Sequence, residues 1–324
     1  MAGERTEHAL KLAAGAARRL GLTVEEPRVL YAGFNVLVHL APAPVVARVP
    51  ALTLAPADEQ AARQRRELDV VGWLAGNGAP VVPPSPLVPR EPVVREDRSL
   101  TFWQYVDERD SIRDTPPEQL EDRFTEQTAW VAELHRLMAG YPGELPAFAP
   151  LVPQAGRLLA DLRARRPESL TVADLDRAEQ EYAVVERAAA DLPRHFPGSR
   201  PQPIHGDSPP YNVLRTARGH LFGDFEDVTL GPIEWDLVGS GPRAVEAYER
   251  AGGTRVDREL LDWMEGARML QVIAALAVTR QDPELDRMLQ PMVGQWRERP
   301  PLTLPLPAAG GPTITGTDAL GTAQ

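Results

Sequence analysis

The chain has 324 residues, which exceeds one average domain and favours two domains or lobes. A formal net charge of −11 disfavours broad binding to nucleic acid, because that function needs a basic surface to neutralise phosphates. The absence of cysteine excludes disulfides and thiolate sites. The sequence contains no long apolar stretch and no secretory signal pattern at its N-terminus. We therefore expect a cytoplasmic protein that binds neither nucleic acid nor membrane.

The first part of the sequence predicts one helix followed by strands. Apolar residues at helical spacing predict a packing helix over residues 6–20. Two β-prone runs at 29–31 and 36–40 flank Gly33, and a third strand is predicted over 44–49. A glycine in the first turn lets the backbone approach a phosphate closely, although most glycine turns are only turns.

Arg48 stands alone in the apolar run of the third strand. Such an arginine needs an anionic partner or exposure to solvent. Residues 57–75 read as a helix, and Glu67 borders its inward face, four residues before Val71. We therefore expect Glu67 to pair with Arg48; the alternative is a solvated glutamate in a charged run.

A change in composition follows the next strand. The proline-rich segment 81–95 favours an extended edge or a loop, and residues 100–106 read as a strand. Helices dominate afterwards, with His135 expected in a structural or surface position. Six helices are predicted, over 117–138, 151–162, 172–190, 235–251, 257–280 and 283–296, with a loop at 193–203. From residue 300 the proline, glycine, threonine and alanine content predicts a disordered tail.

The most informative stretch runs from residue 201 to 227. Asp207 lies five residues before Asn212 on a loop that two prolines keep from becoming helix, and Asp224 follows a short apolar run. Kinase-type phosphoryl transfer needs a carboxylate that orients or accepts the hydroxyl proton and oxygen ligands that hold Mg²⁺. Asp207 suits the first role, and Asn212 and Asp224 suit the second. Taken singly, each of them is also common in ordinary turns.

HGDSPPYNVL, starting at His205, and GDFEDVTLGPIEWDL, starting at Gly223, resemble the aminoglycoside phosphotransferase and related small-molecule kinase family. The resemblance covers nearly all of residues 25–298. It implies an α+β, two-lobed, protein-kinase-like fold, in which a small antiparallel sheet with a helix forms the N-lobe and a larger, mainly helical C-lobe follows. The corresponding division of the chain is an N-lobe at 1–106, a C-lobe at 107–299 and the tail at 300–324.

The resemblance also implies roles for individual residues. Asp207 would be the catalytic base, Asn212 and Asp224 would bind Mg²⁺, and Arg48 would hold the α- and β-phosphates of ATP, or of GTP, while Glu67 orients it. Other nucleotide contacts would come from the first turn and from the crossover between the lobes: Gly33, Phe34, Asn35, Gln104, Tyr105 and Val106. His205 and Asp236 would brace the catalytic loop.

Two features depart from many kinases. Arg48 occupies a position that is often lysine, and residues 33–35 form a single-glycine turn instead of a G-x-G-x-x-G run. Neither change affects Asp207, Asn212 or Asp224. We therefore expect an ATP- and Mg²⁺-dependent phosphotransferase that acts on a hydroxyl of a small molecule, such as an aminoglycoside or another amino alcohol.

Several alternatives stay open at this point. The chain could be a catalytically silent protein that binds a nucleotide or another ligand, whereas a protein kinase is disfavoured because Asp224 does not begin a D-F-G to A-P-E segment. Glu226 and Asp227 are either solvated or bonded within their loop, or they attract Mg²⁺ or a cationic substrate. The acidic net charge is compatible with a cationic substrate, but acidity more often serves solubility. The sequence does not identify the substrate, the preferred nucleotide or the oligomeric state.

Overall fold

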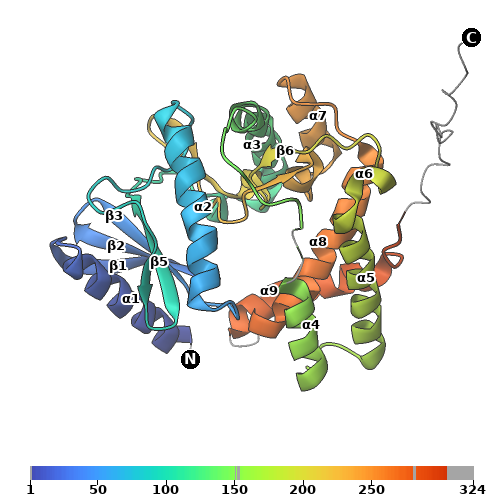
Figure 1. Cartoon of the computed structure of the whole chain (residues 1–324), viewed down its shortest axis with the longest axis horizontal. Helices are drawn as coiled ribbons and strands as arrows, with labels where there is room; N and C mark the ends of the chain where they lie inside the picture. Colours follow the sequence, from blue (N-terminus) through green and yellow to red (C-terminus); the bar gives the residue numbers. More distant parts are fainter. Residues whose placement is uncertain (1, 150, 152–153, 280–281, 305–324) are drawn as a thin grey trace, which may run out of the picture.

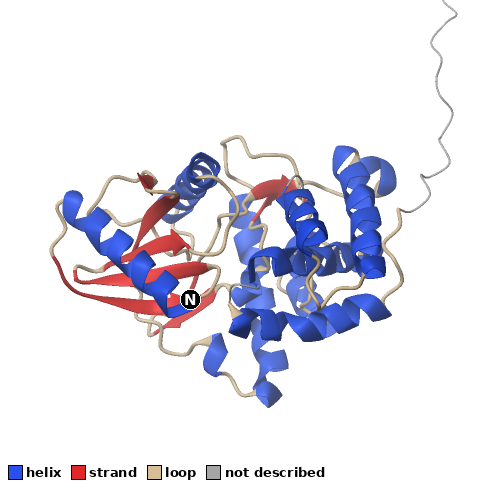
Figure 2. Ribbon diagram, turned by 90° about the horizontal axis from the view of Figure 1, so that it is seen from below, coloured by secondary structure: helices blue, strands red, loops and turns tan. Residues whose placement is uncertain are grey.

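The computed structural model describes residues 2–149, 151, 154–279 and 282–304. Its first part is a five-stranded antiparallel sheet with the strand order β1-β2-β3-β5-β4. The strands are β1 (Val24–Ala32), β2 (Asn35–Pro42), β3 (Val45–Pro50), β4 (Val93–Arg95) and β5 (Arg98–Gln104). Helix α1 (Ala2–Arg19) lies across one face of this sheet (Figure 2), and helix α2 (Ala57–Gly76) lies between the sheet and the helical part of the chain (Figure 1).

The two faces of the sheet have different partners because side chains alternate along a strand. Val45, Ala47 and Val49 of β3 are buried in a core that they share with α1. Val46 and Arg48 point to the opposite face, toward a cavity between the two lobes. The alternation thus buries one face of β3 under α1 and presents Arg48 to the cavity on the other.

The rest of the chain is mainly helical. Its helices are α3 (Pro117–Met138), α4 (Gln154–Arg165), α5 (Val172–Ala190), α6 (Leu192–His195), α7 (Pro242–Arg250), α8 (Arg258–Thr279) and α9 (Pro283–Glu298). Strand β6 (Gln202–Ile204) pairs with β9 (Thr229–Gly231), and β7 (Val213–Thr216) pairs with β8 (Gly219–Phe222). Short 3₁₀ helices are η1 (Ile112–Asp114), η2 (Pro209–Tyr211) and η3 (Ile233–Leu237). The large core joins α2 to these helices, so the lobes share buried surface.

The α+β, two-lobed architecture is therefore confirmed, with corrections at several elements. The helix predicted over 235–251 is divided into η3 and α7, because Gly239 and Gly241 between them adopt positive φ values of 76° and 79°. The strand predicted over 100–106 ends at Gln104, and the loop predicted at 193–203 overlaps α6 and the start of β6.

The predicted tail needs a correction at its beginning. Residues 301–304 lie against the protein instead of being disordered: Leu302 and Leu304 pack on the large core, and Trp263 Nε1 donates a hydrogen bond to Thr303 O at 2.9 Å. The remainder of that prediction, residues 305–324, lies outside the described residues. Of the helices in the described parts of the chain, none has the length and hydrophobicity that a bilayer crossing needs.

Candidate active site

The loop that carries Asp207 is held against the segment that carries Asp224. Gly206 adopts a φ of 90°, and a Cβ atom at this position would lie 2.0 Å from the backbone oxygen of Asp227. Trp235 Nε1 donates to Gly206 O at 2.7 Å from the other side. Only glycine fits between these groups, so packing requires the glycine of the His-Gly-Asp sequence.

Asp236 clamps the same loop through its buried carboxylate. It accepts hydrogen bonds from the backbone N–H groups of His205 and Gly206, both at 2.8 Å, and its Oδ2 lies 2.9 Å from His135 Nε2. Burial alone would raise the pKa of Asp236, but the hydrogen bond with His135 and the neighbouring donors leave it below its ordinary value. The bracing role expected for Asp236 agrees with these contacts. His135 is buried, with its Nδ1 2.9 Å from the Tyr248 hydroxyl, and is structural.

Asp207 and Asn212 are linked within the loop. Asn212 Nδ2 donates to the backbone oxygen of Asp207 at 2.8 Å, and the carboxylate of Asp207 accepts from Arg268 Nη1 at 3.0 Å. The Asp207 side chain is 44% exposed, so a ligand in the cavity can reach it. Desolvation in the cleft raises the pKa of Asp207; Arg268 opposes this shift and Asp227 adds to it.

Arg48 and Glu67 form a buried ion pair. Arg48 Nη1 donates to Glu67 Oε1 at 2.9 Å, and Nη2 donates to Oε2, which gives a two-pronged contact. Burial raises the pKa of Glu67, although Arg48 opposes the shift. The prediction that Glu67 is the partner of Arg48 is confirmed.

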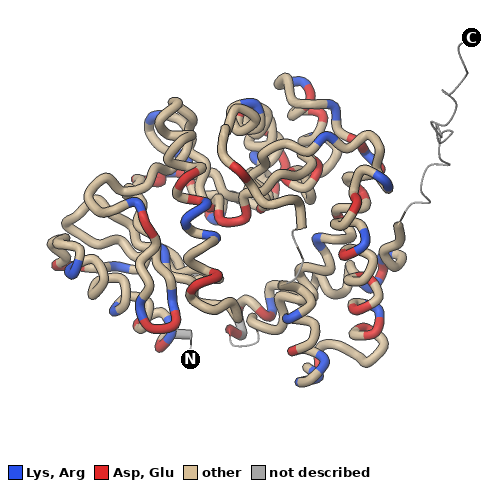
Figure 3. Tube along the Cα trace, in the orientation of Figure 1, with Lys and Arg blue, Asp and Glu red and all other residues tan. Residues whose placement is uncertain are grey.

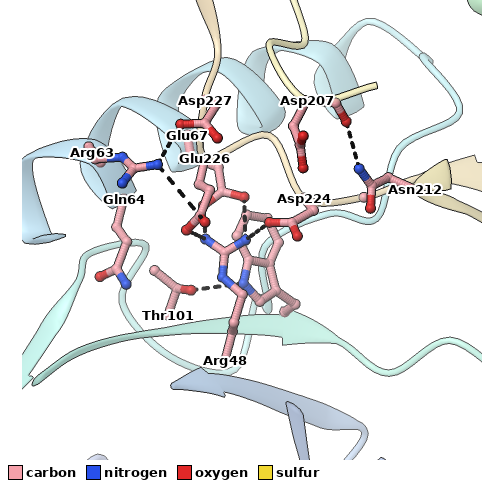
Figure 4. Close-up of polar contacts among 12 residues, drawn as sticks. Arg48, Arg63, Gln64, Glu67, Thr101, Asp207, Asn212, Asp224, Glu226 and Asp227 are labelled. Atoms are coloured by element: carbon pink, nitrogen blue, oxygen red, sulfur yellow. Dashed lines mark hydrogen bonds and ion pairs between the residues drawn. The ribbon is translucent and has the colours of Figure 1, made fainter. Parts of the chain in front are cut away.

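Three acids after β8 reach across to the first lobe (Figure 4). Arg48 Nη1 donates to Asp224 Oδ1 at 2.6 Å, and its Nη2 lies 3.7 Å from Glu226. Arg63, on α2, donates to Asp227 at 2.5 Å and lies 4.0 Å from Glu226. Glu226 and Asp227 are thus bonded to arginines of the other lobe, which is a third possibility beside those left open by the sequence.

A single cavity of about 620 Å³ collects most of the predicted site residues. Those that line it are Phe34, Asn35, Arg48, Gln104, Val106, Asp207, Asn212 and Asp224. Glu67 lies behind Arg48 and is fully buried. The sheet, the crossover segment, the loop that carries Asp207 and the turn after β8 therefore face one space.

Two predicted nucleotide contacts, Gly33 and Tyr105, are not among the residues that line this cavity. Tyr105 turns outward because residues in extended chain alternate in direction: its ring stacks on His39 with 4.1 Å between centroids, and its N–H donates to Pro44 O at 3.0 Å. Gly33 is covered by Tyr31, whose hydroxyl would lie 2.2 Å from a Cβ atom at Gly33. The glycine makes room for that side chain.

Three cavity residues were missed by the sequence analysis. Arg63 lies four residues before Glu67 on the same face of α2, and this spacing could have revealed it. Trp103 lies two residues after Thr101 on β5, and its ring lies 5.5 Å from the Arg48 guanidinium carbon. Arg268, on α8, had no comparable signal, because nothing in its helix marks the face that meets Asp207.

The donor atoms near Asp224 are suited to a hard cation. Asn212 uses its Nδ2 for the bond to Asp207 O, which leaves its Oδ1 available, and Asp224 supplies carboxylate oxygens. In the described residues, no group of three or more His, Cys, Asp or Glu side chains is arranged to hold a metal ion. Two protein oxygen ligands fit Mg²⁺ only when phosphates and water complete its shell, as is usual at nucleotide sites.

A small antiparallel sheet joined to a helical lobe, with a cavity between them, is the architecture of protein-kinase-like phosphotransferases. Residues 32–276 match the model of the phosphotransferase enzyme family, and the chain belongs to that family. The resemblance noted in the sequence is thereby confirmed. No curated protein matches the sequence significantly.

Solved structures with the same fold include three small-molecule phosphotransferases. Amicoumacin kinase hAmiN, in complex with AMP-PNP, Ca²⁺ and Ami, is 11% identical with a TM-score of 0.59, over 93% of this chain and 97% of that one. Choline kinase LicA from Streptococcus pneumoniae is 14% identical with a TM-score of 0.56, over 90% and 100%. Aminoglycoside-3′-phosphotransferase of type VIII is 23% identical with a TM-score of 0.54, over 80% and 97%. At these identities the likeness concerns the fold alone.

Proposed function

We propose that the protein transfers the γ-phosphoryl group of ATP to a hydroxyl of a small molecule, with Mg²⁺ as cofactor. The observation that carries the proposal is the single cavity that Arg48, Asp207, Asn212 and Asp224 line together. These residues come from β3, the loop after β6, the end of η2 and the turn after β8. Membership of the phosphotransferase enzyme family and the nucleotides bound in similar structures add support.

In this proposal Asp207 acts on the acceptor hydroxyl. A bond forms between the acceptor oxygen and the γ-phosphorus, while the bond from that phosphorus to the bridging oxygen breaks and ADP leaves. The hydroxyl proton passes to the Asp207 carboxylate. Exposure of this carboxylate to the cavity and the clamp that Asp236 places on its loop support the role.

Arg48 would hold the nucleotide phosphates, and Glu67 would fix its direction through the two-pronged contact. Asn212 and Asp224 would hold Mg²⁺, which when bound neutralises charge on the phosphates. Gln104 and Val106 would meet the adenine at the crossover between the lobes, since both line the cavity there. These residues position the nucleotide, and Asp207 completes the reaction at the acceptor.

The test is the variant Asp207→Asn, assayed for release of ADP from ATP and Mg²⁺ with a panel of hydroxylated small molecules. Removal of a catalytic base is expected to lower transfer by about 10²–10⁴-fold. Binding of ATP, measured by calorimetry or thermal shift, is expected to persist in the variant. Asp97→Asn is the matched control, because Asp97 is 70% exposed on the turn before β5 and does not line the cavity.

Two outcomes would contradict the proposal. Transfer by Asp207→Asn at the rate of the natural protein would remove Asp207 from the reaction. Binding of ATP by the natural protein with no ADP release above the Asp207→Asn background, for any acceptor, would instead favour the catalytically silent alternative.

A further inference from the structure

The part of the cavity beyond Asp207 has a wall of its own, here named the acceptor side. It consists of Leu151 and of residues on α4, α8 and α9 that line the cavity. Most of them are apolar: Ala155, Leu158, Val272, Ala274, Ala275, Val278 and Leu289. The others are Gln154, Gln271 and Arg268. Within the described residues this wall contributes no carboxylate.

Most acidic side chains elsewhere in the cavity already form ion pairs with arginines. Asp224 and Glu226 face Arg48, Asp227 faces Arg63, and Asp207 bonds to Arg268. Glu108 lines the cavity at the crossover segment, on the nucleotide side. The net charge of −11 is not concentrated here either, since acidic and basic positions are interspersed over both lobes (Figure 3).

Such a wall disfavours a polycationic acceptor. An ammonium group that leaves water needs a carboxylate or several hydrogen-bond acceptors, and without them its burial is strongly unfavourable. An acceptor with several ammonium groups would place some of them against Leu158, Val272 or Ala275. Burial of apolar carbon against the same side chains would instead be favourable.

Arg268 supplies the one charge of the acceptor side in the described chain. Its guanidinium lies over the Trp235 ring, with the central carbon 4.0 Å from the ring centroid. Nη1 donates to Asp207 Oδ1 and to Gln271 Oε1, both at 3.0 Å. Nε and Nη2 are buried without a hydrogen-bond partner among the described residues. Nη1 thus makes both contacts, and the Arg268 side chain is 14% exposed where it lines the cavity.

The position of Arg268 matters as much as its charge. A substrate hydroxyl that reaches Asp207 comes near the guanidinium, because Arg268 is bonded to the same carboxylate. A carboxylate or carbonyl oxygen on a neighbouring carbon of that substrate matches the planar donors of an arginine. A substrate ammonium at the same place would be repelled.

We propose, given the phosphotransferase activity argued above, that the acceptor is a largely apolar alcohol with a carboxylate or carbonyl oxygen near its reacting hydroxyl. Arg268 binds that oxygen, and the apolar side chains of α4, α8 and α9 bind the carbon skeleton. Amino sugars with several ammonium groups are not substrates. This replaces the amino alcohol expected from the family resemblance.

The first experiment compares matched acceptors with the natural protein. Each series holds one apolar alcohol skeleton and varies the neighbouring group between carboxylate, primary amide and amine; kanamycin serves as the polycation. ADP release is measured together with the thermal shift that each compound causes in the presence of AMP-PNP. Carboxylate or amide members are expected to bind and react at least about tenfold better than the amines. Comparison of the carboxylate with the amide then shows whether Arg268 binds a carboxylate oxygen or a carbonyl oxygen.

The second experiment uses Arg268→Gln, which keeps a hydrogen-bonding side chain but removes the charge. KM for carboxylate or amide acceptors is expected to rise by about tenfold or more, with KM for ATP unchanged. Because Arg268 also bonds to Asp207, kcat is expected to fall with every acceptor, whereas KM for alcohols that lack the neighbouring oxygen is expected to stay within about twofold. Arg258→Gln is the control on the same helix, since Arg258 is 50% exposed and outside the cavity.

The outcomes separate this inference from the proposed function. Turnover of kanamycin, or a preference for the amines, overturns the inference and supports phosphoryl transfer. An equal rise in KM for acceptors with and without the neighbouring oxygen in Arg268→Gln, or no rise for either, also overturns it, because the arginine then does not bind that oxygen. Binding of the carboxylate series without ADP release from any acceptor supports the inference and contradicts the proposed function.

Discussion

The phosphate side of the cavity, which Arg48, Asp207, Asn212 and Asp224 line, and the acceptor side hold their residues in different ways. On the phosphate side, charged side chains from both lobes are paired, so each fixes the position of another. On the acceptor side, apolar side chains pack without directional bonds, and Arg268 is the charged group of the described wall. Paired charges suit a reaction whose geometry cannot vary, whereas an apolar wall selects by shape. Changes on the acceptor side alone can therefore redirect the same reaction.

The largest effect is expected from Asp236→Asn, which affects both sides through the loop that carries Asp207. The amide cannot accept all the hydrogen bonds that reach the buried carboxylate, so at least one donor among His205, Gly206 and His135 is left unsatisfied. The free energy of unfolding is expected to fall by about 3 kcal/mol, and transfer to be largely lost. Denaturation in urea and the ADP assay measure the two effects.

A matched control for this variant is Asp262→Asn, because Asp262 is 80% exposed on α8. If Asp236→Asn instead unfolds at the same urea concentration as the natural protein and keeps full transfer, the hydrogen bonds of Asp236 are not what holds the loop of Asp207 in place.

Glu67→Gln is expected to change the phosphate side of the cavity without changing the acceptor side. The amide retains the shape of Glu67 but leaves the buried Arg48 without its main counter-charge, so Arg48 is drawn to Asp224 and Glu226. Affinity for ATP is expected to fall by about tenfold to a hundredfold, while KM for the acceptor stays within about twofold. Calorimetry with ATP and steady-state kinetics measure these constants.

Asp69→Asn is the control on the same helix, since Asp69 is exposed there. Should KM for the acceptor rise in step with KM for ATP in Glu67→Gln, the two sides are coupled and the contrast between them fails.

The residues found from the sequence belong mainly to the phosphate side, and the reason is physical. Arg48 was found because a lone charge in an apolar strand needs a partner, and Glu67 because helical spacing puts it on the inward face. Asp207, Asn212 and Asp224 were predicted to lie together from their spacing on a short loop and the strands after it, and they line one cavity. Four strands of the sheet and most helices followed from periodicity, whereas β4 lies in the proline-rich segment that favoured an edge or a loop.

The acceptor side was not predictable in the same way. Arg268 meets Asp207 only because α8 packs beside the catalytic loop, a contact between residues 61 positions apart. Its neighbours in the sequence, Ala267 and Met269, indicate a packed helix but not which face meets the cavity. Tyr105 directly follows β5, and the sequence pattern does not specify the direction of its side chain, which stacks on His39.

Arg63→Ala tests the partly exposed edge of the phosphate side. Arg63 and Asp227 are 29% and 38% exposed, so solvent screens their pair more than the buried pair of Arg48. KM for ATP is expected to rise by only about threefold to fivefold, and the rise to shrink at high salt. Kinetics at low and high ionic strength measure it, with the exposed Arg65→Ala as control. An effect as large as that of Glu67→Gln would place Arg63 in direct contact with the nucleotide.

The smallest effect is expected at a pair outside both sides of the cavity. Arg297, on α9, makes a two-pronged contact with Asp174 on α5, with distances of 2.7 Å and 3.1 Å. The hydrogen bond from Arg297 lowers the pKa of Asp174 to about 2 from an ordinary value of 3.8. Since the pKa is lower in the folded state, this stabilisation is complete above the ordinary value and is lost as the pH falls toward 2.

Arg297→Gln is therefore expected to lower the free energy of unfolding by about 1 kcal/mol at neutral pH, with a difference that shrinks below about pH 4. Urea denaturation across this pH range measures it, and Arg136→Gln, at a 69% exposed residue, is the control. KM for ATP and for the acceptor should not change, because neither Arg297 nor Asp174 lines the cavity. A change in either constant would mean that the contact between α5 and α9 affects the position of Leu289, which lies on α9 and lines the cavity. The shape of the acceptor side would then depend on contacts outside the cavity.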